Sequence, residues 1–230
     1  MRVSKKWFVS QHGPAVQTTF NFALFVQPVD RNNILIKVAI CGACGVGKTG
    51  ILTRLYGNTF SDVYRRTQGF DFRNIYCKFW GERLKLQVWD TPGDESWDSG
   101  IIFRSAKDVA MCCMDLTDRD GLRHARYFLE MALHSCRENA VLILVGCKQD
   151  LVSERRVSAE QARELASEMG AFAYVECSSK TGEGVRHSAA TGIMQYYYNQ
   201  RKSRGAAAAA PAQYIQQVYK RRKKRKCMVM

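Results

Sequence analysis

A glycine-rich octapeptide that ends in lysine and threonine carries the strongest chemical signal in the chain. It reads Gly42-Ala43-Cys44-Gly45-Val46-Gly47-Lys48-Thr49 and matches the phosphate-binding pattern G-x-x-x-x-G-K-[ST]. Glycines let backbone N–H groups wrap phosphate oxygens, because they carry no Cβ to block the approach. Lys48 can reach the β and γ phosphates, and the Thr49 hydroxyl can ligate Mg²⁺. The sequence therefore predicts a site for a nucleoside triphosphate with Mg²⁺.

The segments on either side of this loop are those that it needs. Residues 34–40 form an apolar, β-branched run that predicts a buried strand, and residues 51–55 predict the start of a helix. Gly50, which joins the loop to this helix, is expected to bind the nucleotide together with the loop residues. The N-terminus of that helix adds positive potential for a bound anion.

Strand-like and helix-like runs alternate from residue 34 to about residue 200. Residues 70–80 and 83–89 predict a hairpin, and the apolar runs 109–114, 141–145 and 172–176 predict buried strands. Helical spacing covers residues 121–136, 158–169 and 183–198, and Ser158 with Gln161 predicts a capping box. This order predicts an α/β fold of the P-loop NTPase type. Its mostly parallel six-stranded sheet has one antiparallel edge hairpin strand and helices on both faces.

Composition limits the classes of protein that the chain can represent. Its 230 residues suit one domain with tails, and 46% hydrophobic with 24% charged residues is ordinary for a globular protein. No apolar stretch approaches the roughly 18 residues of a membrane-spanning helix. The nine cysteines show no zinc-ligand spacing, so we expect free thiols in a reducing compartment.

Both ends are predicted to lie outside the domain. Residues 1–33 form an N-terminal extension that we expect to be disordered; a transit peptide and an upstream start codon are the alternatives. Residues 201–230 form a flexible tail with an alanine-rich linker at 205–212. Half of the net charge of +14 lies in the basic tract Lys220–Lys226, which suits an anionic membrane or a nucleic acid.

Five blocks in this order resemble the Ras superfamily of small GTPases, and most closely its Rab branch. They are the phosphate-binding loop, Thr67–Phe72, Trp89–Glu95, Cys147–Asp150 and Cys177–Gly182, and the resemblance covers residues 34–200. The Rab branch is indicated by Gly69-Phe70-Asp71-Phe72 and by Trp89 before Asp90.

The resemblance implies a role for each block. Thr49, Thr67 and Asp90 would hold Mg²⁺, while the N–H of Gly93 would sense the γ-phosphate. Phe60 would pack on the guanine edge. Guanine would be bound by residues of the last two blocks: Cys147, Lys148, Asp150, Ser178, Ser179 and Lys180. Asp150 would select guanine over adenine by accepting two N–H bonds.

The catalytic centre departs from the family at three positions. Cys44 stands where glycine is usual and crowds the γ-phosphate, and Pro92 replaces an alanine. Asp94 stands where the family has the glutamine that orients the attacking water, and a carboxylate cannot donate an amide hydrogen bond. With Lys48, Thr67 and Gly93 as the other catalytic residues, we expect slow GTP hydrolysis, unless Asp94 acts through water or another residue substitutes.

The guanine-binding blocks contain a fourth departure. Cys147 replaces the asparagine that ties the guanine-binding loop to the phosphate-binding loop. Losing one or two hydrogen bonds costs roughly 1–3 kcal/mol, or about tenfold to hundredfold in affinity. We expect GTP and GDP still to bind but to exchange faster, which would leave the protein mostly GTP-bound.

The last four residues, Cys227-Met228-Val229-Met230, fit the C-a-a-X prenylation signal, and a terminal methionine favours farnesyl. One lipid chain with a polybasic tract provides the two signals of a stable anchor. A nuclear-localisation or RNA-binding tail is the alternative for the tract. Most Rab proteins end in two lipidated cysteines, so this single site suits a Ras-like anchor.

These features together predict a lipid-anchored switch on the cytoplasmic face of the plasma membrane or an endomembrane, acting in vesicle trafficking or signalling. Its effectors would bind residues 60–72 and 93–105, and exchange and activating proteins would act on it; no nucleic acid is expected as a partner. The rival is a nucleotide-insensitive membrane scaffold. An ATP-driven nucleic-acid protein is disfavoured by Asp150 and the C-a-a-X end.

Overall fold

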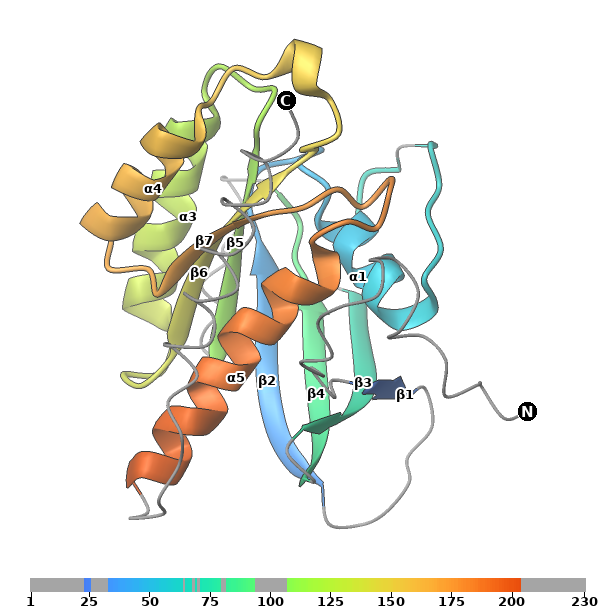
Figure 1. Cartoon of the computed structure of the whole chain (residues 1–230), viewed down its shortest axis with the longest axis vertical. Coiled ribbons are helices and arrows are strands. Elements are labelled where there is room, and N and C mark those ends of the chain that lie inside the picture. The colour runs from blue at the N-terminus through green and yellow to red at the C-terminus, as the bar shows by residue number, and fades with distance from the viewer. Residues whose placement is uncertain are drawn as a thin grey trace, which may run out of the picture.

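A computed structural model describes residues 23–25, 33–63, 65–67, 69, 71–79, 82–93 and 107–203. These residues form one sheet that lies between two layers of helices (Figure 1). In chain order the elements are β1 (Ala23–Phe25), β2 (Ile34–Cys41), α1 (Lys48–Gly57), β3 (Asp71–Phe79), β4 (Glu82–Asp90), β5 (Val109–Asp115), α3 (Gly121–Ser135), β6 (Val141–Cys147), the 3₁₀ turn η1 (Val152–Glu154), α4 (Ala159–Glu168), β7 (Ala173–Glu176) and α5 (Val185–Ser203).

The sheet has the strand order β1-β3-β4-β2-β5-β6-β7. β2 pairs in parallel with β4 and β5, and the parallel pairing continues through β6 to β7. β3 runs antiparallel to β4 as a hairpin. The predicted P-loop NTPase fold, with its mostly parallel six-stranded sheet and one antiparallel strand, is therefore confirmed.

A seventh strand extends this sheet beyond the prediction. β1 pairs antiparallel with β3, the strand that we expected at the edge, in the register Ala23↔Lys78 to Phe25↔Tyr76. It comes from the segment 1–33, which the sequence analysis placed outside the domain. The edge strand of a sheet has unpaired N–H and C=O groups that can pair with any extended segment. Because this pairing uses backbone groups, the side-chain pattern of residues 23–25 did not predict it.

Two hydrophobic clusters separate the sheet from its helices. Ile36, Val38 and Ile40 of β2 pack on the side of α1 and α5, whereas Ala39 and Cys41 face α3 and α4. β5 and β6 contribute to both clusters, so these strands are buried on both faces, as their continuous apolar runs predicted. Figure 1 shows α3 and α4 on one face, and α1 and α5 on the other.

The helix boundaries agree with the sequence to within a few residues, except that α5 continues to Ser203, beyond the predicted Tyr198. The predicted capping box at the start of α4 is confirmed. The Ser158 hydroxyl accepts a bond from the Gln161 N–H at 3.2 Å, and the Gln161 side chain accepts one from the Ser158 N–H at 2.9 Å.

The eight cysteines within the described residues are free thiols, in agreement with the prediction. Among those residues, no helix is both long enough and apolar enough to cross a membrane. Asp94, most of the segment 93–105, the tract Lys220–Lys226 and Cys227 lie outside the described part of the chain.

Candidate nucleotide-binding site

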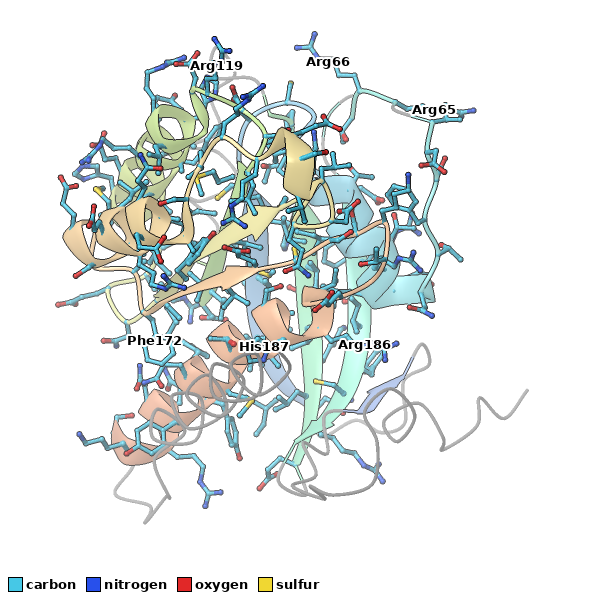
Figure 2. All side chains as sticks on the ribbon, turned by 45° about the horizontal axis from the view of Figure 1, so that its top comes forward. Arg65, Arg66, Arg119, Phe172, Arg186 and His187 are labelled. Atoms are coloured by element: carbon cyan, nitrogen blue, oxygen red, sulfur yellow. The ribbon has the colours of Figure 1, made fainter. Side chains whose placement is uncertain are left out.

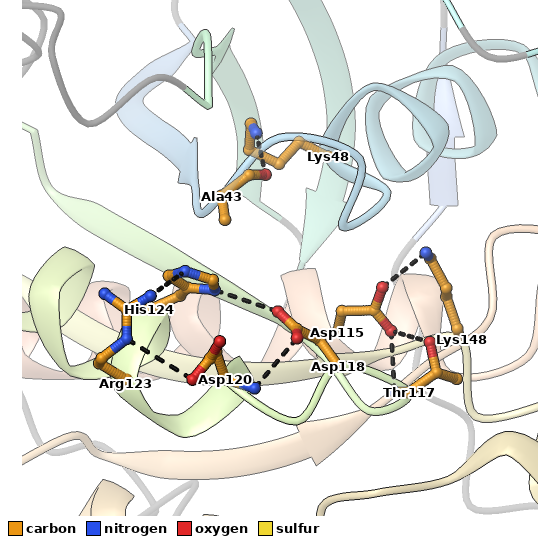
Figure 3. Close-up of polar contacts among 9 residues, drawn as sticks. All are labelled: Ala43, Lys48, Asp115, Thr117, Asp118, Asp120, Arg123, His124 and Lys148. Atoms are coloured by element: carbon orange, nitrogen blue, oxygen red, sulfur yellow. Dashed lines mark hydrogen bonds and ion pairs between the residues drawn. The ribbon is translucent and has the colours of Figure 1, made fainter.

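The phosphate-binding loop joins the carboxyl end of β2 to the N-terminus of α1. Gly47, the residue before α1, has a φ of 110°, a left-handed conformation that glycine adopts without strain. Lys48 is buried, and its Nζ donates to the carbonyl oxygens of Gly42 and Ala43 at 2.8 Å each. Its ammonium group is thereby held across the loop, where a phosphate group would meet it (Figure 3).

Three oxygen-bearing side chains from separate segments meet next to this loop. The Thr49 hydroxyl donates to Asp90 Oδ2 at 2.5 Å and lies 2.9 Å from the Thr67 hydroxyl. Thr49 opens α1, Asp90 ends β4, and Thr67 lies on the chain between α1 and β3. The three residues predicted to hold Mg²⁺ are therefore together, although 41 positions separate the first from the last.

The environment of Asp90 suits a cation. Its side chain is fully buried, and burial raises the pKa of this carboxyl, as does the nearby charge of Asp71. The Thr49 hydrogen bond and the charge of Lys48 lower the pKa, but burial outweighs them. Asp90 Oδ1 is buried and has no hydrogen-bond partner among the described residues. A buried carboxylate oxygen without a donor is costly unless a cation or its water satisfies it.

The donor set fits Mg²⁺ rather than a softer metal. Hydroxyl and carboxylate oxygens are ligands that Mg²⁺ prefers, and it commonly takes one or two from protein and the rest from phosphate and water. The described residues contain no cluster of three or more His, Cys, Asp and Glu side chains able to hold a metal alone. Thr49, Thr67 and Asp90 would thus hold the ion together with a bound phosphate.

Gly93 lies directly against the phosphate-binding loop. A Cβ on this residue would stand 2.3 Å from the backbone nitrogen of Cys44 and 2.5 Å from the carbonyl carbon of Ala43. No side chain larger than hydrogen fits there, so only glycine allows this segment to approach the phosphate-binding loop so closely. Cys44 itself is exposed, and Pro92 is buried beside Gly93.

Lys148, one of the predicted guanine-binding residues, is held by a carboxylate that the sequence analysis missed. Its Nζ donates to Asp115 Oδ2 at 2.6 Å, while Asp115 Oδ1 accepts from the Thr117 N–H at 2.8 Å and the Thr117 hydroxyl at 2.7 Å (Figure 3). Asp150 follows Lys148 in the same loop and is half-buried. A signal for Asp115 exists: it ends β5 as Asp90 ends β4, at the strand ends where ligands of parallel sheets bind.

The loop after β7 is closed by its own hydrogen bonds. The Ser178 hydroxyl accepts from the Thr181 N–H at 3.0 Å, and the Ser178 carbonyl accepts from the Gly182 N–H at 2.8 Å. Lys180 is exposed and lies 3.5 Å from Asp62, on the segment between α1 and β3. This loop and that segment are therefore neighbours at the mouth of the site.

Arg54 of α1 joins the predicted guanine-binding parts. Its Nε donates to the Ser179 carbonyl at 2.6 Å, and its Nη2 donates to the Lys180 carbonyl. Its guanidinium carbon lies 5.8 Å from the centroid of the Phe60 ring. One side chain thus positions the base loop against α1 and Phe60. Nothing in the sequence predicted this role, because the side chain of an arginine on a helix usually lies in solvent.

Cys147 ends β6 beneath the loop. Its Cβ is 3.9 Å from the position that a Cβ on Gly47 would take. Its thiol bonds to the Val145 carbonyl of its own strand, at a sulfur–oxygen distance of 3.7 Å, and not to any described atom of the phosphate-binding loop. Hydrogen bonding with Cys147, together with burial, raises the pKa values of the Cys113 and Cys177 thiols that surround it.

A second polar cluster lies at the start of α3 (Figure 3). Asp118 accepts from the Asp120 N–H at 3.0 Å and lies 3.1 Å from Nδ1 of His124, while Arg123 bonds His124 Nε2 at 2.9 Å. These contacts fix the turn between β5 and α3. On the segment between α1 and β3, Arg65 and Arg66 are exposed and extend away from the sheet (Figure 2).

The fold and this arrangement define a P-loop NTPase. A model of the Ras family matches residues 37–197. RabC of Dictyostelium discoideum is 35% identical over 156 residues, covering 66% of this chain and 79% of that protein. Rab-4 of the same organism is 35% identical over 153 residues (66% and 74%), and mouse Rab-12 is 31% identical over 156 residues (67% and 64%). The chain belongs to the Ras superfamily of small GTPases, in its Rab branch.

The raised pKa of Asp90 predicts a pH dependence of stability. Between the unfolded-state value, about 3.9, and the higher folded-state value, the folded protein binds more protons, so stability falls as pH rises through that interval. We expect Asp90→Asn to raise the melting temperature of nucleotide-free protein in EDTA at neutral pH, and the gain to shrink on acidification. The measurement is thermal unfolding at several pH values.

Asp62→Asn is the matched control, since Asp62 is 78% exposed. With Mg²⁺ and GDP present the order should reverse, because asparagine brings no charge to the cation. Parallel pH profiles for wild type and Asp90→Asn would contradict the assigned environment of this carboxyl.

Proposed function

We propose that this small GTPase is a lipid-anchored guanine-nucleotide switch that hydrolyses GTP slowly and is held mainly in its GTP-bound form. One observation carries the switch: the Thr49 hydroxyl bonds both Asp90 and Thr67. A Mg²⁺–GTP complex would bind at this point and order the segment that bears Thr67, and the loss of the γ-phosphate would release it. Effectors would recognise the ordered form through residues 60–72 and 93–105.

Guanine selectivity is supported by Asp150, whose carboxylate matches the two N–H donors of the base. Adenine would leave that carboxylate without a donor, which costs affinity. Lys148, held by Asp115, would lie along the base with its aliphatic stem.

Slow hydrolysis is supported by the residues that surround Gly93. Cys44 stands where the family has glycine, and its backbone lies directly against Gly93; its side chain would crowd the space that the γ-phosphate and an arginine from an activating protein need. Asp94 cannot orient water as a glutamine amide does, and its charge opposes the phosphoryl oxygens.

We expect Asp94→Gln to raise the single-turnover rate of GTP hydrolysis by on the order of tenfold, because the amide orients water and adds a donor to the transition state. Asp98→Asn removes a carboxylate from the same segment and should leave the rate unchanged. If the wild type hydrolysed GTP as fast as Asp94→Gln does, the proposal that Asp94 slows hydrolysis would be wrong.

Fast exchange is supported by the thiol of Cys147, which bonds the Val145 carbonyl of its own strand. Among the described residues it makes no hydrogen bond to the phosphate-binding loop, where an asparagine would supply one. We expect Cys147→Asn to slow the release of a fluorescent GDP in Mg²⁺ by about tenfold or more, since most affinity changes appear in the off-rate. Cys147→Ser, which removes sulfur without supplying an amide, should change the rate much less. Slow release from the wild type, unaltered by Cys147→Asn, would count against this account.

The proposed anchor is a prenyl group on Cys227 with the basic tract Lys220–Lys226. One lipid chain binds marginally, and each basic residue near anionic lipid adds up to about 1 kcal/mol. We expect the farnesylated full chain to float with phosphatidylserine vesicles, more weakly at high salt, and Cys227→Ser to remain in solution. Equal flotation of the two forms would refute lipid anchoring at this cysteine.

A nucleotide-insensitive scaffold remains the second candidate, favoured only by the altered Cys44 and Cys147. The two candidates differ in one property: a switch must bind Mg²⁺–GTP tightly and in preference to ATP. A protein that binds neither nucleotide would be the scaffold.

A further inference from the structure

Gly50, in the first turn of α1, leaves room for the side chain of Ser179. A Cβ on Gly50 would stand 2.6 Å from Ser179 Oγ and 2.9 Å from Ser179 Cβ. Both distances are shorter than non-bonded carbon and oxygen atoms tolerate. Ser179 thus packs against the start of α1 only because residue 50 is a glycine.

The position of the Ser179 hydroxyl is well defined. Its oxygen is 3.7 Å from the position that a Cβ on Gly47 would take, and Phe60 Cε2 is 3.9 Å from the equivalent position on Gly50. The backbone of Ser179 is fixed by the 2.6 Å bond from Arg54 to its carbonyl. The hydroxyl therefore lies where the phosphate-binding loop, α1 and Phe60 converge.

This hydroxyl is available to a ligand. Within the described residues it makes no hydrogen bond, in contrast to the neighbouring Ser178 hydroxyl, which is occupied by the Thr181 N–H. The nearby Cys147 thiol is a poor hydrogen-bond donor to a nucleotide, because thiols donate weakly and this one already bonds the Val145 carbonyl.

Guanine has three hydrogen-bond acceptors besides the N–H groups that Asp150 would bind, and N3 lies next to the amino group. O6 adjoins those groups, whereas N7 belongs to the imidazole ring, which carries the sugar and leads to the phosphates. Ser179 lies beside Gly47 and Gly50, on the phosphate side of the base loop. We propose that the Ser179 hydroxyl donates a hydrogen bond to N7 of guanine, a contact made possible by Gly50.

This inference rests on the proposed guanine-nucleotide site and assigns a specificity residue within it. Its test compares GDP with 7-deaza-GDP, in which a C–H replaces N7, by measuring affinity and off-rate in Mg²⁺ for the full chain. One neutral hydrogen bond supports about a fivefold preference for GDP in the wild type. Ser179→Ala should lose about the same factor for GDP, lose little for 7-deaza-GDP, and so abolish the preference.

Gly50→Ala provides a second variant, since its methyl group would displace the Ser179 hydroxyl and should also abolish the preference. Ser167→Ala, at an exposed hydroxyl of α4, is the control and should retain it. A purely structural role for Ser179 would lower both affinities equally, and that result would overturn the proposal. So would an unchanged preference in Ser179→Ala. If the wild type bound neither nucleotide, the proposed switch itself would fail.

Discussion

The hydrogen bonds of one hydroxyl hold this site together. Thr49 Oγ1 lies 2.5 Å from Asp90 and 2.9 Å from Thr67, so the phosphate-binding loop, the end of a central strand and the chain between α1 and β3 converge at one atom. Because Asp90 is fully buried and its Oδ1 has no hydrogen-bond partner in the part of the chain that the structure describes, this convergence is electrostatically incomplete without a cation. A Mg²⁺ ion held together with a bound phosphate would satisfy this oxygen, which is why the proposed function places Mg²⁺–GTP at this point.

Most of the scaffold could be predicted because it obeys strong local rules. The runs at 109–114 and 141–145 became strands buried on both faces, and the Ser158 capping box opened α4 as expected. Parallel strands bring their carboxyl ends to one edge, so residues as distant as Thr49, Asp90, Lys148 and Ser178 had to gather there. The family membership shown by the comparisons agrees with the five sequence blocks.

The remaining features could not be predicted because they are contacts between residues far apart in the sequence, and those contacts form only in the folded structure. Arg54 reaches the carbonyls of the base loop, and only the packed structure reveals that contact. Asp115 holds Lys148 through a 2.6 Å bond across two strands. β1 joins the edge through backbone groups, which every sequence possesses. The contact between Gly50 and Ser179 likewise needs three-dimensional proximity, although each residue is visible in the sequence.

The central claim is that this site retains guanine nucleotide and that the altered catalytic centre leaves it as GTP. The most direct measurement is the nucleotide released by denaturing full-length protein purified in Mg²⁺ buffer, separated by ion-exchange chromatography. We predict mainly GTP. Mainly GDP would contradict slow hydrolysis with fast exchange, and an empty site or bound ATP would contradict the guanine-nucleotide switch itself.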